Sequence, residues 1–162
     1  MGRQITSNED CAYIAGFLDG DGSVIVQIKK TKTHAKNWRL MFTVCFYQDN
    51  RHAKPLEWFR RKLGKGYVSK RNDGITELRI NGYESVREIL EKLYPYAKFK
   101  RKQIGYVLKA LNLLRQKSFR ELTKNERLKI ARAILKSRQE TYQSGFKKME
   151  KLRSDLKKIT EM

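Results

Sequence analysis

The chain has 162 residues, 40% of them hydrophobic, which is enough for one domain with a buried core and excludes a disordered basic tail. Its 37 lysines and arginines stand against 17 aspartates and glutamates, a formal net charge of +20 that favours DNA or RNA as the partner. No apolar run is long enough to cross a bilayer and no signal-peptide core is present. We therefore expect an intracellular protein, of undetermined compartment, with no membrane partner.

The cysteines and histidines do not form a pattern that predicts a disulfide or zinc site. There are two of each, and they are widely scattered: Cys11, Cys45, His34 and His52. This spacing matches neither a disulfide framework nor a zinc finger.

The first predicted element is a helix that begins near residue 7 and ends near Leu18. Ser7 or Thr6 can cap it, and an acidic residue three positions further on can complete a capping box. Gly20 and Gly22 are expected to end it.

Two hairpins are predicted next, because runs of alternating polar and apolar residues are typical of half-buried strands. Their strands are expected at residues 23–32 and 38–47, and at residues 67–71 and 75–80. Each hairpin has one apolar face for the core. The opposite face of the first hairpin carries cations and no acidic residue, which favours contact with DNA over a simple solvated surface.

Helical periodicity accounts for most of the remaining chain. The predicted helices cover residues 54–63, 83–93, 103–115, 123–138 and 144–158. The order α-β-β-α-β-β-α, with additional C-terminal helices, indicates an α+β fold. We expect a single domain over residues 1–162, with a core at about 7–115 and C-terminal helices at about 123–158.

The most specific signal is the stretch from Ile14 to Gly22. Apolar and small residues of helical character run into Asp19-Gly20-Asp21-Gly22, and an alternating strand follows. Acidic, glycine-rich ends also occur in calcium loops, but the other EF-hand ligands are absent. With the α-β-β-α order that follows it, the chain resembles the single-motif LAGLIDADG homing endonucleases over roughly residues 12–103.

The resemblance implies a function and an assembly. It implies an intron-encoded, site-specific DNA endonuclease that cuts both strands of a long pseudo-palindromic site across the minor groove and leaves 3′ overhangs. It also implies a homodimer through the motif helices, with Tyr13, Ala15, Gly16 and Phe17 at the interface. Two alternatives on the same fold are an RNA-splicing maturase and a DNA-binding regulator that does not cut.

A metal site follows from the same resemblance. Asp21 takes the position of the family's catalytic metal ligand, with the Gly20 carbonyl as a second ligand. Oxygen ligands suit Mg²⁺, and Mn²⁺ or Ca²⁺ can substitute for it in binding. Asp19 is expected to support the end of the helix.

Three further catalytic positions are implied. Gln48 corresponds to a polar residue that orders water, and Lys100 to a basic residue that stabilises phosphate charge. Lys98 or Lys102 can exchange roles with Lys100. His52 occupies a position where family members often carry a cation. The resemblance therefore does not settle which residue makes the third active-site contact.

Sequence reading is expected from the strands, because a two-stranded ribbon fits the major groove of DNA. The candidate contacts to bases and phosphates are Gln27, Lys29, Thr31, Arg39, Ser69, Arg71, Glu77 and Arg79.

Overall fold

The computed structural model describes residues 6–30, 38–115, 117–141 and 145–161. The chain divides into two compact units. Unit 1 comprises Met1–Ile25 and Phe42–Arg101, and unit 2 comprises Val26–Met41 and Lys102–Met162. The expected turn at residues 33–37 and the candidate contact Thr31 lie outside the described residues.

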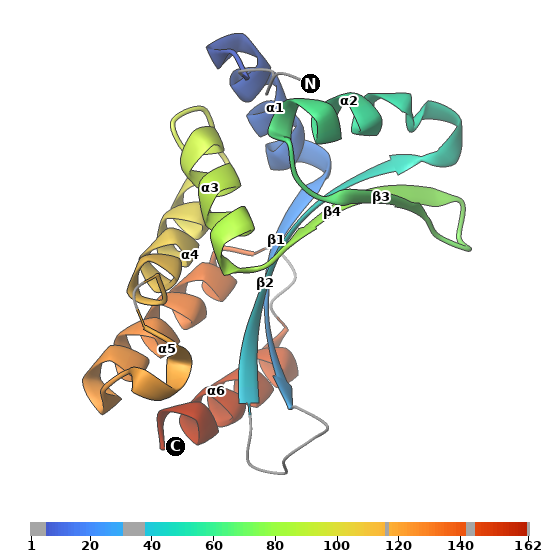
Figure 1. Ribbon diagram of the computed structural model, residues 1–162. Coiled ribbons are helices and arrows are strands. Elements are labelled where there is room, and N and C mark those ends of the chain that lie inside the picture. Colours follow the sequence, from blue (N-terminus) through green and yellow to red (C-terminus); the bar gives the residue numbers. More distant parts are fainter. Residues whose placement is uncertain (1–5, 31–37, 116, 142–144, 162) are drawn as a thin grey trace. The chain divides into compact units, whose positions relative to one another are not determined.

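The described strands form one four-stranded sheet in the order β1-β2-β4-β3 (Figure 1). They are β1 (Gly22–Lys30), β2 (Trp38–Asp49), β3 (Tyr67–Lys70) and β4 (Ile75–Asn81). Strand β4 runs antiparallel to both of its neighbours, and places Arg79 opposite Cys45 of β2 and Tyr67 of β3. Strands β1 and β2 each continue from one unit into the other.

Unit 1 contains the helices α1 (Asn8–Asp21), α2 (Lys54–Leu63) and α3 (Tyr83–Leu93). Helix α2 packs on β3 and β4, α3 packs on β4, and α1 packs on α3. The core of this unit is rich in aromatic residues. The ring of Phe59 lies 5.3 Å from that of Phe46 and 5.1 Å from that of Phe17, both edge to face, a favourable geometry for aromatic pairs.

Unit 2 contains the helices α4 (Arg101–Leu113, whose first residue belongs to unit 1), α5 (Lys124–Gln139) and α6 (Phe146–Thr160). Helices α5 and α6 lie side by side (Figure 1). The predicted capping box opens α5, where Thr123 and Glu126 each accept a hydrogen bond from the other's backbone amide.

The predicted element order and the α+β class are confirmed, and the differences are local. Ser7 caps α1 and forms the capping box with Asp10, but the helix continues to Asp21, so Gly20 lies inside it. Strand β2 extends to Asp49, and Gln48 therefore lies in the strand instead of after it. Two short 3₁₀ helices, Asn50–His52 and Phe119–Glu121, carry no periodic signal that would have predicted them.

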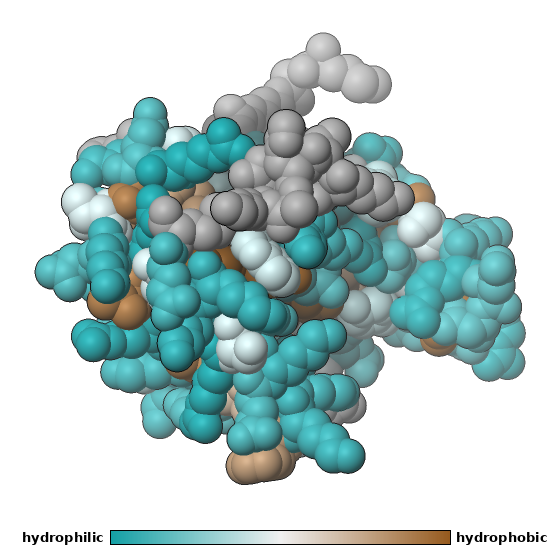
Figure 2. Space-filling model, turned by 90° about the horizontal axis from the view of Figure 1, so that it is seen from below, coloured by the Kyte–Doolittle hydropathy of each residue, from teal (hydrophilic) through white to brown (hydrophobic). Residues whose placement is uncertain are grey.

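No described helix is both long enough and apolar enough to cross a membrane. The face of the molecule shown in Figure 2 is mostly hydrophilic, and its hydrophobic residues are scattered. Such a surface fits the charge balance of the sequence.

Candidate functional site

The end of α1 is tied to the segment before α4 by one carboxylate. Asp19 Oδ2 accepts hydrogen bonds from the backbone amides of Lys98 (2.6 Å) and Phe99 (3.2 Å), and Oδ1 accepts from the amide of Lys100 (2.9 Å). The Lys100 Nζ in turn donates to the Asp19 carbonyl oxygen at 2.7 Å. Residues about 80 positions apart in sequence are thereby fixed side by side, and the Lys100 ammonium is fixed at the end of the motif helix.

Asp21 contrasts with Asp19, two residues before it. Its side chain is exposed, and it forms no hydrogen bond or ion pair with any described residue. It is close enough to act electrostatically on Lys100. Burial lowers the pKa of the Lys100 ammonium below its ordinary value, and the charges of Asp19 and Asp21 oppose that shift. The site therefore presents an unpaired carboxylate beside a half-buried amine.

The donors at this point fit a hard cation. Asp21 supplies a free carboxylate, and Gly20 lies in the last turn of α1, where carbonyl groups lack an amide partner within the helix. Mg²⁺ uses few protein oxygens and retains several waters. Among the described residues there is no cluster of three or more His, Cys, Asp or Glu side chains that could hold a metal. One chain thus offers a sparse oxygen site.

Lys100 is distinguished from its two neighbouring lysines. Lys98 and Lys102 are exposed, whereas the Lys100 side chain is half-buried and bonded to α1. This geometry favours Lys100 over Lys98 and Lys102 as the residue that stabilises phosphate charge.

Gln48 and His52 lie at and just beyond the end of β2. Gln48 is half-buried, and its Oε1 accepts a hydrogen bond from the Asp49 amide at 2.9 Å. His52 is exposed in the short helix that follows. Arg51 pairs with Asp49 at 2.9 Å and lowers the pKa of that carboxyl to about 2. Neither Gln48 nor His52 hydrogen-bonds with Asp21 or Lys100 in the described part of the chain.

The second hairpin presents two arginines that are already paired. Ser69 lies opposite Glu77 in the β3–β4 register, and Arg79 follows on the same face, as predicted. Glu77, however, is only 7% exposed, and its carboxylate holds Arg79 at 3.1 Å. Glu77, predicted as a DNA contact, is thus buried in the separate chain, where it orients Arg79. Arg71, in the turn after β3, pairs with Asp73 at 2.6 Å.

The candidates on the first hairpin are unpaired. Gln27, Lys29 and Arg39 are all exposed, and none forms an ion pair or hydrogen bond within the described chain. Since no carboxylate competes for them, these side chains are available to a polyanion.

The exposed side of α1 differs partly from the predicted interface. Tyr13 is 62% exposed, Gly16 is exposed, and Phe17 is half-buried against Phe46 and Phe59. Ala15, also predicted at the interface, is 0% exposed, because the helical repeat places it on the side that packs in its own core.

Sequence reasoning placed Gly16 at the interface but missed the stripe of small residues to which it belongs on the exposed side of α1. Ala12, Gly16 and Gly20 are exposed and follow one another at intervals of four residues. A methyl group added at Gly16 or Gly20 would meet no described atom within 4 Å. The i, i+4 spacing of small residues is the signal that could have found this surface.

Comparisons with known proteins agree on one family. The model of the LAGLIDADG endonuclease family matches residues 14–110. The chain is 34% identical over 103 residues to the DNA endonuclease I-CvuI of Chlorella vulgaris, covering 64% of each chain. It is 32% identical over 108 residues to the DNA endonuclease I-CreI of Chlamydomonas reinhardtii, covering 67% of this chain and 66% of that one. These matches span slightly less than two thirds of each relative's length.

The fold is also similar over nearly the whole chain. A crystal structure of I-CvuI in complex with its target in the presence of 2 mM Ca superposes with a TM-score of 0.74 at 28% identity. The match covers 94% of this chain and 95% of that one.

Proposed function

Because the chain belongs to the LAGLIDADG endonuclease family, we propose that it is a homing endonuclease that cuts both strands of a specific DNA site by Mg²⁺-dependent phosphodiester hydrolysis. The observation that carries this proposal is the pair of carboxylates at the end of α1. Asp19 is fully engaged with the backbone of residues 98–100, while Asp21 beside it is exposed and unpaired. A protein with so large a cationic excess retains this unpaired carboxylate next to a lysine, which suits a metal held against a phosphate.

The residues at this site divide the work. Asp21 and the Gly20 carbonyl would hold Mg²⁺, which when bound polarises a phosphate and lowers the pKa of water. The Lys100 ammonium can contact a phosphate oxygen as negative charge develops on it. Asp19 acts as a positioning residue, because its three amide contacts determine where Lys100 lies. Gln48 and His52 supply the outer contacts to water and phosphate.

A homodimer completes the site. Each chain carries one Asp21, whereas a double-strand cut requires hydrolysis of two phosphodiesters. The stripe formed by Ala12, Gly16 and Gly20 allows two α1 helices to approach closely, with Tyr13 packing beside the seam. Two copies related by a two-fold axis favour a long pseudo-palindromic target. Cutting across its minor groove would leave 3′ overhangs.

Sequence reading is assigned to the polar face of the sheet. Arginine pairs well with guanine and glutamine with adenine in the major groove. Arg79 is held in one orientation by Glu77, which reduces the side-chain entropy lost when it contacts a base. Gln27, Lys29 and Arg39 need no internal ion pair to be broken.

The test is a cleavage assay on a library of long random duplexes, with Mg²⁺ and with EDTA. We expect Mg²⁺-dependent double-strand cuts within one enriched sequence, and no cuts by Asp21→Asn although binding remains. Glu140→Gln removes an exposed acidic residue elsewhere and is the matched control, which should cut normally. Binding without Mg²⁺-dependent cutting, or undiminished cutting by Asp21→Asn, would contradict the proposal.

A further inference from the structure

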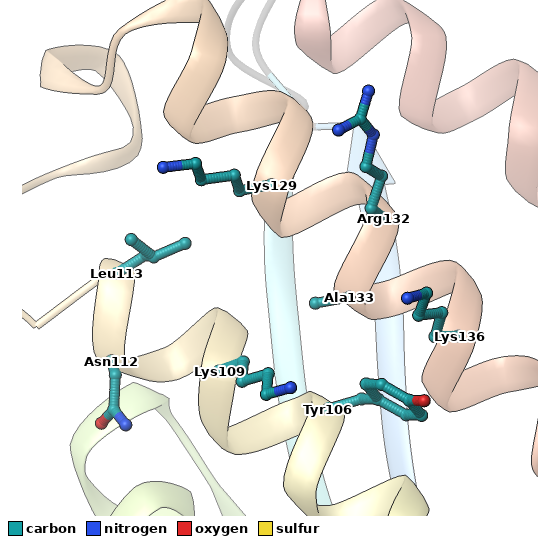
Figure 3. Close-up of a pocket in the computed structure, with 8 residues that line it drawn as sticks. All are labelled: Tyr106, Lys109, Asn112, Leu113, Lys129, Arg132, Ala133 and Lys136. Atoms are coloured by element: carbon teal, nitrogen blue, oxygen red, sulfur yellow. The ribbon is translucent and has the colours of Figure 1, made fainter.

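A groove in unit 2 gathers several cations. It lies between α4 and α5 and encloses about 540 Å³ (Figure 3). Lys109 reaches it from α4, and Lys129, Arg132 and Lys136 reach it from α5. None of the predicted site residues lines it.

These four cations have no acidic counterpart. None of them forms an ion pair with a carboxylate in the described ranges. Helix α4 contains no acidic residue, and α5 contains only Glu126. That carboxylate is occupied by Lys117 and by the capping box at the start of α5. The groove therefore concentrates positive charge without internal neutralisation, which is unfavourable for the protein alone.

Tyr106 forms part of the groove wall and brings two of the cations together. The Lys109 ammonium lies 5.5 Å from the centre of its ring, and the Lys136 ammonium lies 5.7 Å from it. Figure 3 shows these two lysines, from different helices, converging on Tyr106. Because the ring already contacts cations, it does not offer a free platform for stacking a base. The groove therefore suits an anionic group better than the face of a base.

The spacing on α5 matches a repeated anion. Lys129, Arg132 and Lys136 are three and four residues apart and lie along one side of the helix. At a rise of about 1.5 Å per residue, they extend over roughly 10 Å. One strand of duplex DNA carries a phosphate about every 3.4 Å of helix axis, so this length corresponds to about three phosphates.

We propose that this groove binds the phosphate backbone of a nucleic acid, as a contact separate from the motif helix and the strand residues expected to read DNA. Its four cations would replace the counterions of neighbouring phosphates, a contribution to affinity that is independent of base sequence. Flanking duplex DNA and an RNA strand share this chemistry. The proposal does not depend on cleavage, because the groove contains no acidic residue that could hold a metal.

A fluorescent label in the groove tests the contact directly. Asn112 is exposed and lines the groove, while Cys11 and Cys45 are buried, so Asn112→Cys provides a thiol that can be labelled selectively. The labelled protein is titrated, without divalent metal, with random-sequence duplex DNA, with single-stranded RNA and with a nucleoside triphosphate. We expect a saturable change in emission with DNA, RNA or both, and its loss when Lys129, Arg132 and Lys136 are all changed to Gln.

No response to either nucleic acid would overturn the proposal. A response to the triphosphate alone at equal phosphate concentration would overturn it as well. The triphosphate result would indicate a small-molecule site instead.

Salt dependence gives an independent measurement with a matched control. The variant Lys129→Gln/Arg132→Gln/Lys136→Gln should lower the magnitude of the slope of log K against log salt by about 2 for single-stranded RNA or about 3 for duplex DNA. The control Lys147→Gln/Lys151→Gln/Arg153→Gln removes equal charge from exposed positions of α6, and should lower it by less than half as much. Equal decreases in slope for the two triple variants would show that only the net charge of the protein matters, and would overturn the proposal.

The groove test needs a folding check, and its result is independent of the endonuclease proposal. Thermal unfolding of both triple variants checks that each is folded. Since cleavage is not measured, failure of the groove proposal leaves the endonuclease proposal standing, and loss of the endonuclease proposal leaves the groove proposal testable.

Discussion

The two units of this protein use charge in opposite ways. Unit 2 contains 22 of the 37 lysines and arginines but only 6 of the 17 acidic residues, a formal charge of +16. Unit 1 contains the other 15 basic and 11 acidic residues, a formal charge of +4. Among the described residues, unit 1 has eight ion pairs and unit 2 has two.

This difference teaches how the net charge of +20 should be understood. In unit 1 the carboxylates position cations and amides, as Glu77 positions Arg79 and Asp19 positions Lys100. Asp21 is exposed and forms no ion pair with the described residues, and we propose that it binds the metal. Most cations among the described residues of unit 2 form no ion pair, so their charge is available to a polyanion. We therefore expect substitutions in unit 1 to change the rate of DNA cleavage, and substitutions in unit 2 to change the affinity for nucleic acid of any sequence.

The largest expected effect separates the two carboxylates of the motif. Asp21→Asn should reduce single-turnover cutting by roughly 10³-fold or more, since it removes the proposed metal ligand. Its unfolding free energy should change little, because the side chain is exposed and unpaired. Asp19→Asn should instead lower the unfolding free energy by about 1–3 kcal/mol, since the amides of residues 98–100 lose a charged acceptor.

Cleavage rates and urea unfolding of the two variants measure this contrast. If Asp19→Asn were as stable as the unaltered protein while Asp21→Asn unfolded easily, the assignment of the two residues would have to be reversed.

A second contrast concerns two glycines at the motif helix. A methyl group at Gly22 would lie 2.6 Å from Leu18 Cδ1 and 2.7 Å from its Cα, so Gly22→Ala should destabilise the chain by about 1–3 kcal/mol. Gly16→Ala fills open space in a helix and should stabilise the separate chain by about 0.5–1 kcal/mol. The same methyl group should weaken the dimer, because it lies in the proposed seam.

Chemical unfolding at low protein concentration and light scattering at high concentration distinguish these effects. A dimer as tight as that of the unaltered protein in Gly16→Ala would argue against close packing at this stripe.

A third measurement tests the charge of unit 2. Its unpaired cations repel one another, and salt screens that repulsion. Raising the salt concentration from about 0.02 to 0.5 M should therefore increase the melting temperature by a few degrees. A decrease would show that the ion pairs of unit 1 dominate the electrostatic stability instead.

The smallest expected effect lies on the polar face of the sheet. Burial and the neighbouring Cys45 raise the pKa of Tyr47 to about 12, from an ordinary value of 10.0. Between these pH values the unfolded chain releases the tyrosine proton and the folded chain retains it, so stability falls as pH rises through this window. Tyr47→Phe should lessen that fall by about 1 kcal/mol. Unfolding followed from pH 9 to 12 measures it, with Tyr67→Phe at an exposed position as the control.

Local signals in the sequence predicted the elements well. The capping boxes at Ser7 and Thr123 and the alternation in the strands depend on neighbouring residues, and the structure confirms them. The Ile14–Gly22 motif predicted the family in the same way.

Tertiary contacts account for what the sequence did not reveal. Nothing near Asp19 indicates that its acceptors would meet the amides of residues 98–100. Glu77 has the alternation of a surface residue, yet its cross-strand neighbours bury it. The cationic groove combines residues of two helices whose charges are, in each helix alone, typical of a solvated surface. Such features depend on packing partners that periodicity does not identify.

The most direct test of the account uses two copies of the chain joined in tandem, acting on the target found in the library. With Asp21→Asn in one copy only, we expect double-strand cutting to be lost and at most single-strand nicks to remain, because one copy supplies half of the active site. A tandem with Glu140→Gln in the same copy should cut both strands normally. Double-strand cutting at the unaltered rate by the Asp21→Asn tandem would contradict the account.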